Sequence, residues 1–399
     1  MFAALLTVHV LARGITSLES FSVALEAAVF WPVLGVNVLV GLAIVLFVAQ
    51  EGTGALRVLL TVGAALLIGF VIMLIISQDP LRAYNALLTG PVSRLNRWGT
   101  WIDDALALLL IAAAITVVFR ARLFSLGGEG QIFLGALASG LVALYVTGLP
   151  PLIHAGLAVA AGCAAGLIWG LIPGLLRAHL EASELVSTLM LNPVAILLYQ
   201  MFVERLREPG SSSVTSPPLP DTALLARIIP GTRVTTAILI AGVVVLLVWV
   251  LLRRTPLGYA IRMIGANPRF AHYGGINVRR TIVSAMLISG ALGGLTGAYM
   301  ALAIYQRLPQ SVASGLTFEG IVVALLARNN PLALPAMALL YAYLRAGAPI
   351  MQNDAAVSLE IVRVIQAVII LLFTAEGLVS FWRLRGKREA ADALQKAEA

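Results

Sequence analysis

Long apolar runs dominate this chain of 399 residues, and short polar stretches separate them. Most of the runs reach the ~17–25 residues that a membrane-spanning helix needs. The run at 316–327 is shorter, which predicts a half-helix or a re-entrant segment. The pattern therefore predicts ten or eleven membrane segments, all of them helical. The runs lie at residues 33–50, 58–76, 105–119, 131–149, 152–176, 185–203, 234–252, 281–304, 316–327, 332–348 and 361–382.

The composition indicates an integral membrane protein. Hydrophobic residues make up 60% of the chain, the mean hydropathy is +0.96 and only 12% of residues are charged, against about 25% in soluble domains. We therefore predict a single all-α membrane domain over residues 32–386 and no soluble domain. Residues 1–31 lack the features of a cleavable secretory signal and form an ill-defined N-terminal segment, while residues 387–399 form a tail.

The formal net charge of +8 is better explained by membrane topology than by nucleic-acid binding. Arginines crowd the loop at 253–280 and also follow the last apolar run. Because positively charged loops stay cytoplasmic, this loop and the C-terminus are predicted to be cytoplasmic. The loop at 205–233 then faces outward. Its composition cannot bury a core of its own, so it is either a flexible surface loop or a docking surface for an extracytoplasmic partner.

The cytoplasmic loop carries the sequence signals of two short helices. The first is entered through Pro256, and the second begins after Asn267, a favoured N-cap residue that Pro268 follows. Gly274 and Gly275 end the second helix with a left-handed cap. Apolar side chains exposed within a rim of arginines are typical of a protein interface. The predicted docking residues are Ile261, Met263, Asn267, Arg269, Phe270 and Tyr273.

A glycine-rich break between two apolar runs, at residues 123–131, holds a carboxylate at membrane depth. A charge there costs roughly 2.5–3.5 kcal/mol even on a lenient scale, so Glu129 is expected to be functional and sheltered from lipid. A similar sequence recurs later, because Glu319-Gly320 repeats Glu129-Gly130 after another glycine-bearing segment. We call this repeat the internal echo. Repeated halves with interrupted helices point to a translocation site. Chance similarity between apolar helices explains so short a match equally well.

Neither catalytic nor metal-binding chemistry is predicted. The four histidines are scattered, Cys163 is the only cysteine, and the sequence has no phosphate-binding G-x-x-x-x-G-K-[ST] loop. Asp103 and Asp104 directly precede an apolar run, which places them at the positive end of a helix dipole. We expect a protein that is not an enzyme and has no cofactor. If ATP drives its transport, another chain must bind the ATP.

Five stretches carry a resemblance to a known family, and they lie at residues 123–131, 183–192, 258–278, 315–331 and 345–348. In order and spacing they are similar to permease subunits of ATP-binding-cassette (ABC) importers in the branched-chain amino acid and simple sugar superfamily, above all to nucleoside importer permeases. The resemblance implies a type II-like importer permease in a bacterial cell membrane. One departure is Pro193, which follows Asn192 where the family often has an aromatic residue. We expect the helix to break there.

The resemblance also implies the partners. Two homologous permeases pair around a central path, a substrate-binding lipoprotein delivers the nucleoside from outside, and an ABC ATPase subunit docks on the loop at 258–278. A ribose-type sugar importer shares much of this pattern and is the alternative substrate class. An ion-coupled secondary transporter, with Glu129 and Glu319 as the coupled groups, is the alternative mechanism. It would have no need of a cytoplasmic docking loop.

Polar residues within the apolar segments are the candidates for the substrate path. A nucleoside is neutral and rich in hydroxyls, so the path needs amides, hydroxyls and small residues rather than fixed charge. The candidates are Glu129, Gln131, Ser187, Thr188, Asn192, Glu319 and Asn329. Each has a structural alternative, because hydroxyls can bond to their own helix, amides can join two helices and carboxylates can cap helix N-termini.

Overall fold

The computed structural model describes residues 70, 74, 80–207, 213–228, 234–313 and 315–355. The chain divides into two compact units: residues Met1–Leu88 with Gly347–Ala399, and residues Thr89–Ala346. The second unit holds the helices from α5 to α13 and the first part of α14. Outside the described residues lie the predicted N-terminal segment 1–31, the tail 387–399, the apolar runs 33–50 and 361–382, and most of the run 58–76.

The described residues form helices and no strands, which confirms the all-α fold. The long helices are α5 (Leu95–Arg120), α6 (Gly128–Tyr145), α7 (Pro151–Leu180), α8 (Glu184–Arg205), α9 (Ala237–Arg254), α12 (Val278–Tyr299) and α14 (Leu334–Ala355). The short ones are α4 (Pro80–Thr89), η1 (Gly90–Val92), α10 (Pro256–Ala266), α11 (Pro268–Tyr273), the π-helix η2 (Met300–Tyr305) and α13 (Leu316–Leu326).

Eight of the eleven predicted apolar runs are helices in this part of the chain. Six helices are long and apolar enough to cross a membrane, namely α5, α7, α8, α9, α12 with η2, and α14. The other two, α6 and α13, follow the glycine-bearing segments of the internal echo, and α13 has only 11 residues. The chain is therefore a multi-pass membrane protein in which α13 matches the predicted half-helix.

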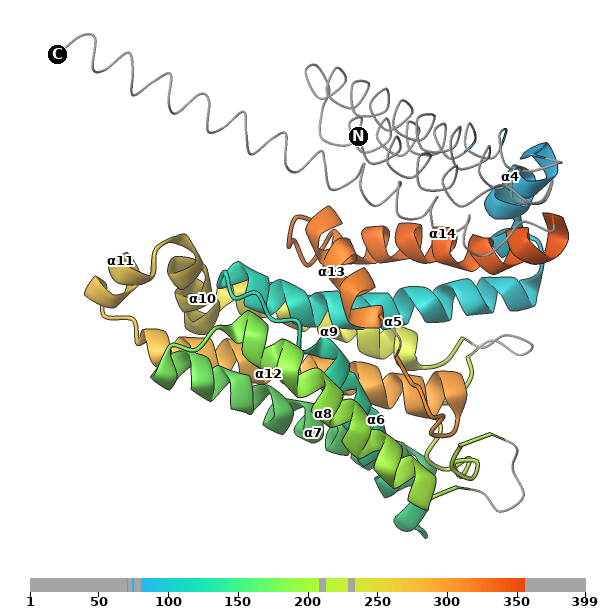
Figure 1. Ribbon diagram of the computed structural model, residues 1–399, viewed down its shortest axis with the longest axis horizontal. Helices are drawn as coiled ribbons and strands as arrows, with labels where there is room; N and C mark the ends of the chain where they lie inside the picture. The colour runs from blue at the N-terminus through green and yellow to red at the C-terminus, as the bar shows by residue number, and fades with distance from the viewer. Residues whose placement is uncertain are drawn as a thin grey trace, which may run out of the picture. The chain divides into compact units, whose positions relative to one another are not determined.

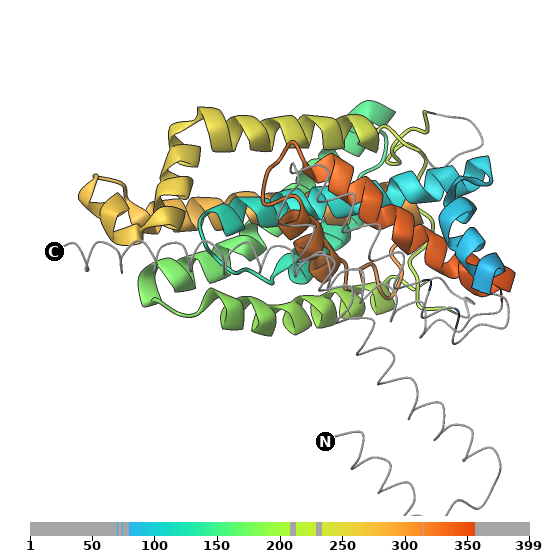
Figure 2. The same ribbon diagram turned by 90° about the horizontal axis from the view of Figure 1, so that it is seen from above.

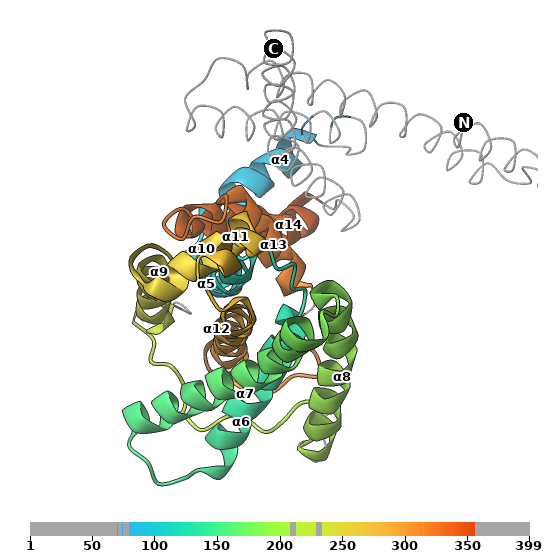
Figure 3. The ribbon, with the colours of Figure 1, turned by 90° about the vertical axis from the view of Figure 1, so that its left-hand side faces the viewer.

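Helix α12 is the central element of the second unit. Figure 3 shows it between α5 on one side and α7 on the other. Helices α9 and α8 lie on opposite sides of this bundle, in yellow and green in Figure 2. At one end, α10 and α11 extend beyond the ends of α5 and α12 (Figure 1). We call this end the α11 end.

Glycines allow α7 and α12 to pack backbone against backbone. On α7, glycines recur every fourth residue from Gly162 to Gly174, and Gly290 and Gly294 face them from α12. A methyl group added to Gly166 would overlap the Gly290 carbonyl oxygen, and one added to Gly294 would overlap the carbonyl oxygen of Gly162. Small residues at such spacing let membrane helices approach closely. This contact, which we call the glycine seam, holds the centre of the bundle together.

Two predictions about helix boundaries are wrong. Helix α5 begins at Leu95, so Asp103 and Asp104 lie two turns inside it and not at its positive end. Asp103 is 4% exposed, and the Tyr299 hydroxyl donates to its Oδ1 at 3.2 Å. Helix α8 does not break after Asn192, because it continues through Pro193 to Arg205. Proline removes one backbone hydrogen bond, but α8 is bonded to other elements on both sides of Pro193, through Asn192 to the Leu126 carbonyl and through Tyr199 to the Pro309 carbonyl.

The described part of the predicted outer loop, residues 213–228, is packed and not a free surface loop. Leu219 and Ala223 belong to the hydrophobic core. The Leu308 N–H donates to the Ser216 hydroxyl at 2.9 Å, and the Ser216 N–H donates to the Leu308 carbonyl at 3.0 Å. The loop cannot bury a core of its own, but it completes one by covering the chain between η2 and α13.

Candidate translocation site and docking loop

The first turns of α6 and α13 meet inside the bundle. The Gly315 N–H, at the start of α13, donates to Oε1 of Glu129 in the first turn of α6 at 2.8 Å. A methyl group added to Gly128 would lie 2.7 Å from the Thr317 side chain. The two glutamates of the internal echo therefore stand on two helix starts that touch, which we call the junction. Two positive helix ends converge there.

The non-helical segment before α6 is fastened to α8 by side chains. The Asn192 Nδ2 donates to the Leu126 carbonyl of this segment at 2.8 Å, and its Oδ1 accepts from the Gly130 N–H in the first turn of α6 at 3.0 Å. The Leu126 N–H donates to the Thr188 hydroxyl at 3.1 Å. Glu184 accepts from the Phe124 N–H at 3.3 Å. Backbone groups that cannot bond within a helix thus find partners, as membrane burial requires.

These contacts and the packing around them favour the structural alternative for four of the predicted path residues. The Ser187 and Thr188 hydroxyls donate to the Glu184 carbonyl, at 3.2 and 2.6 Å. Asn192 is 6% exposed, and both ends of its amide are engaged. Gln131 is 2% exposed and packs against Gly293 of α12. These residues form the wall behind the junction.

Two buried polar atoms at the junction have no hydrogen-bond partner among the described residues. One is the Thr317 hydroxyl, which lies beside Gly128, and the other is the Trp169 indole N–H, which lies beside Gly130. A methyl group on Gly130 would approach that indole nitrogen to 2.7 Å. Buried polar atoms without partners call for an explanation. These two buried groups beside the first turn of α6 therefore have unused hydrogen-bonding capacity.

Three charged residues, Asp104, Glu319 and Arg345, lie near one another on α5, α13 and α14. Arg345 of α14 donates to Oε2 of Glu319 at 2.7 Å, and the two side chains are 34% and 29% exposed. Asp104 of α5 lies within electrostatic reach of the same guanidinium. Glu319 was among the predicted path residues, whereas Asp104 was predicted only to start a helix and Arg345 was included only in the family-like stretch 345–348. The available signal for Arg345 was its position inside the apolar run 332–348, because ionisable residues there usually face a polar space.

Asn329 does not join the junction. It follows the opposite end of α13, where the Arg120 Nε donates to its backbone carbonyl at 2.8 Å. Arg120 is the last residue of α5, and Gly265 of α10 packs against its carbonyl. Asn329 therefore lies at the α11 end, separated from the other path candidates by the length of α13.

The two helices of the 253–280 loop form as their sequence signals predict. The Thr255 hydroxyl caps α10 by accepting from the Gly258 N–H at 3.0 Å. The Asn267 side chain caps α11 by accepting from the N–H groups of Arg269 and Phe270, at 3.0 and 3.1 Å. Gly275, with a φ of 80°, provides the left-handed residue after α11.

The exposed surface of this loop is narrower than predicted. Phe270 and Tyr273 are 61% and 88% exposed, and Arg269 is also exposed. Met263 is half-buried. The prediction that Ile261 is exposed is wrong, because this side chain is fully buried in the hydrophobic core. Helix α10 is amphipathic, and Ile261 lies on the face that attaches it to the bundle. Phe270 and Tyr273 of α11 form the apolar tip.

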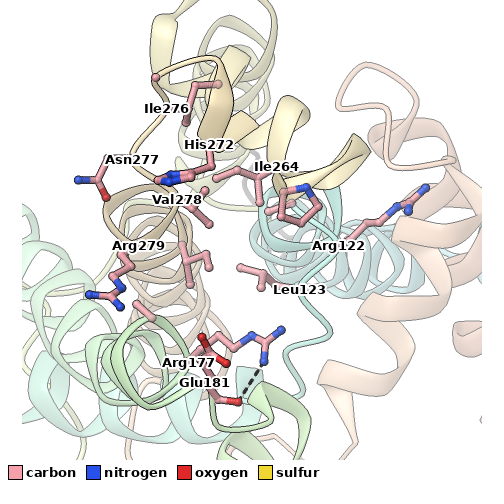
Figure 4. A pocket seen from close by; sticks show the side chains of 15 residues that line it. Arg122, Leu123, Arg177, Glu181, Ile264, His272, Ile276, Asn277, Val278 and Arg279 are labelled. Carbon is pink, nitrogen blue, oxygen red and sulfur yellow. Dashed lines mark hydrogen bonds between the residues drawn. The ribbon is translucent and has the colours of Figure 1, made fainter. Parts of the chain in front are cut away.

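A cavity of about 950 Å³ lies behind α11, between the C-terminal ends of α5 and α7 and the start of α12. Figure 4 shows His272 of α11 on one side of it, with Arg122, Arg177 and Arg279 around it. Arg177 is held in place, because its guanidinium donates to the Glu181 carbonyl at 3.3 Å and pairs with Glu184 at 3.1 Å. The α11 end thus combines an apolar tip with a cationic hollow.

No group of three or more potential metal ligands occurs among the residues that the structure describes. The described residues offer buried polar groups at the junction and an exposed apolar tip at the α11 end.

Comparison with known proteins gives consistent matches. The sequence model of a family described as "Branched-chain amino acid transport system / permease component" matches residues 99–374. The nucleoside ABC transporter permease protein NupB of Lactococcus lactis is 28% identical over 72% of this chain and 82% of its own length. The guanosine ABC transporter permease protein NupP of Bacillus subtilis is 30% identical over 74% of this chain and 85% of its own.

A third relative is named for a different substrate. The glucose ABC transporter permease protein TsgB13 of Haloferax volcanii is 29% identical over 72% of this chain and 80% of its own length. No solved structure matches.

Proposed function

Because this chain belongs to the family of branched-chain amino acid transport system permease components, we propose that it forms half of the translocation path of an ATP-driven importer for nucleosides. The junction carries this proposal. Two helix starts meet inside the bundle, each with a carboxylate in its first turn. Transporters build substrate sites from discontinuous helices whose ends point at the ligand.

The substrate class rests on the relatives and on the open polar atoms of the junction. NupB and NupP are named for nucleoside and guanosine transport, whereas TsgB13 is named for glucose. A nucleoside has ribose hydroxyls and a base edge, which suit the Thr317 hydroxyl and the Trp169 indole N–H. The flat face of the base could also stack on the Trp169 ring, which a sugar alone could do less well.

Transport needs partners, and we propose three. A second, homologous permease completes the path, a substrate-binding lipoprotein delivers the nucleoside from outside, and a separate ABC ATPase hydrolyses ATP. Members of this family are transport subunits and not enzymes. The loop at 253–280 and the C-terminus are cytoplasmic in this scheme, because of their arginines. ATPase closure rocks the two permeases against each other and opens the path alternately to either side.

The apolar tip of α11 is the proposed contact with the ATPase. Phe270 and Tyr273 are large, exposed and adjacent to the cationic hollow. In the variant Phe270→Asp/Tyr273→Asp, a docked tip would bury two unpaired carboxylates, each with a desolvation penalty of several kcal/mol. At about 1.4 kcal/mol per tenfold change, we expect the ATPase to dissociate.

Co-purification of the ATPase and substrate uptake test this contact together. The control Tyr145→Asp makes the same chemical change at an exposed residue, 69% exposed, at the far end of α6. It should leave the complex intact. Arg269→Ala should have a small effect, because rim charges change association rate more than affinity. If the double variant keeps full co-purification and uptake, the loop is only a connector.

Uptake by the whole complex in proteoliposomes tests the function itself. We expect ATP-dependent accumulation of radiolabelled adenosine or uridine, with no uptake of ribose or glucose. Uptake of a sugar without any nucleoside would reject the substrate class and leave the permease role intact. Uptake by this chain alone, driven by a proton or sodium gradient without ATP, would instead establish the ion-coupled alternative with Glu129 and Glu319.

A further inference from the structure

A second cavity, of about 440 Å³, lies between α7 and α12 at the α11 end. Helix α12 contributes Arg279, Arg280 and Val283 to its lining, and α7 contributes Leu175 and His179. This cavity shares no residue with the junction of α6 and α13. It plays no part in the proposed path. Its lining combines cationic groups with apolar ones.

The two arginines are available to a ligand. Both are exposed, and neither takes part in any of the ion pairs found among the described residues. The hydrogen bonds that the described residues make with Arg280 use its backbone, because its N–H donates to the Asn277 side chain at 3.0 Å and its carbonyl accepts from the Ser284 hydroxyl at 2.8 Å. Guanidinium groups bind phosphate oxygens through two parallel hydrogen bonds. Arg279, Arg280 and His179 all line this cavity, and such a set of cationic and polar groups fits a phosphate diester.

An exposed apolar stripe on α7 leads into this cavity. Ile168, Ile172 and Leu175 are 61%, 37% and 42% exposed, and together with His179 they follow the i, i+4, i+7, i+11 spacing of one helix face. The first three residues lie in the membrane-spanning part of α7. A soluble anion has no use for such a stripe, whereas an acyl chain would cover it. The stripe and the arginines together match the two parts of a lipid.

We propose that this cavity binds an anionic phospholipid, with its phosphate on Arg279 and Arg280 and an acyl chain along the α7 stripe. Basic pockets between transmembrane helices are known to hold anionic headgroups. The cavity is formed by the two helices of the glycine seam. The lipid would therefore bind at the start of α12, next to the turn that joins it to α11. The inference requires membrane insertion and does not depend on which substrate is transported.

Native mass spectrometry of the detergent-solubilised chain, titrated with phosphatidylglycerol, tests the proposal. The variant Arg279→Gln/Arg280→Gln should bind roughly 30-fold more weakly, which corresponds to about 2 kcal/mol at about 1 kcal/mol per arginine near a lipid headgroup. The matched control is Arg253→Gln/Arg254→Gln. It removes the same charge from exposed residues at the same end, in the last turn of α9, outside both cavities.

Three further arms distinguish the sources of the phosphate. Phosphatidylcholine should bind at least tenfold more weakly than phosphatidylglycerol, and the water-soluble headgroup glycerophosphoglycerol should not bind measurably. Val283→Trp, which fills the cavity and keeps both arginines, should weaken lipid binding as well. Thermal unfolding in lipid-free detergent should be the same for all variants, which separates lost binding from lost folding.

The proposal is overturned if both arginine pairs weaken phosphatidylglycerol binding equally, since the attraction would then be diffuse. It is also overturned if the soluble headgroup binds as tightly as the lipid, because the site would then be one for a free phosphate ester. Binding that Val283→Trp leaves unchanged would place the lipid elsewhere on the protein.

Discussion

The non-helical segments that precede α6 and α13 are held in different ways. The segment before α6 is bonded to a long helix, through the Asn192 amide and the Thr188 hydroxyl of α8. The segment before α13 is bonded to the packed outer loop, through Ser216, and at its last residue to Glu129. Helix α13 itself is tied to α14 by the ion pair of Glu319 with Arg345.

This difference divides the junction into a fixed half and a releasable half. The α6 side is anchored by several hydrogen bonds to one spanning helix, most of them to the neutral side chains of Thr188 and Asn192. The α13 side is anchored by a loop and by charged groups that are partly exposed. Elements with few buried contacts open most readily. We therefore expect α13, and not α6, to move when the path changes its access.

Asn192→Leu should have the largest effect on stability. It leaves the Gly130 N–H and the Leu126 carbonyl without partners, and each unsatisfied buried group costs about 1–3 kcal/mol. We expect a loss of about 2–5 kcal/mol, seen as a strongly lowered thermal unfolding midpoint in detergent. Asn96→Leu, at an exposed residue in the first turn of α5, is the control. Equal midpoints for the two variants would mean that α8 does not anchor the α6 side.

Arg345→Met should have an intermediate effect. It leaves the Glu319 carboxylate unpaired, which costs about 3–5 kcal/mol in a fully buried pair and less here, about 1–3 kcal/mol, because both side chains are about one third exposed. The double variant Glu319→Gln/Arg345→Met should recover much of the loss. A double-mutant cycle on unfolding midpoints measures the coupling, and additive effects would show that this pair does not hold α13.

Glu129→Gln should have the smallest effect. The glutamine Oε1 can still accept from the Gly315 N–H, so only the charge assistance is lost, about 1 kcal/mol. Glu129→Leu removes the bond altogether and should destabilise more. The comparison needs both unfolding midpoints and nucleoside uptake. If Glu129→Gln stops uptake while stability is retained, the carboxylate serves transport directly and its contact with Gly315 is incidental.

Features that depend on near neighbours could be predicted from the sequence. The caps of α10 and α11 need only a side chain and an N–H two or three residues away, so Thr255, Pro256 and Asn267 were informative by themselves. The apolar runs likewise predicted the spanning helices. The boundary of α5 failed because Asp103 and Asp104 look like a helix start, whereas tertiary partners such as Tyr299 let them lie inside the helix.

Features that depend on distant partners could not be predicted. The sequence marked Asn192 as polar and membrane-embedded, but its bonds are to a segment more than 60 residues away. The face of α10 that carries Ile261 became clear only from its packing. The glycine seam is different, because a glycine at every fourth residue of α7 is a visible signal for close helix packing, and it should be read as one.

The glycine seam has a mechanical consequence. Side-chain contacts can absorb a displacement by changing rotamers, whereas carbonyl and Cα atoms in direct contact have no such freedom. Helices α7 and α12 should therefore act as one stiff lever. Helix α11 is joined to the start of α12, so a displacement of α11 would be transmitted to the N-terminal end of α7. There, the His154 ring lies 2.9 Å from the hydroxyl of Thr222 in the segment 213–228.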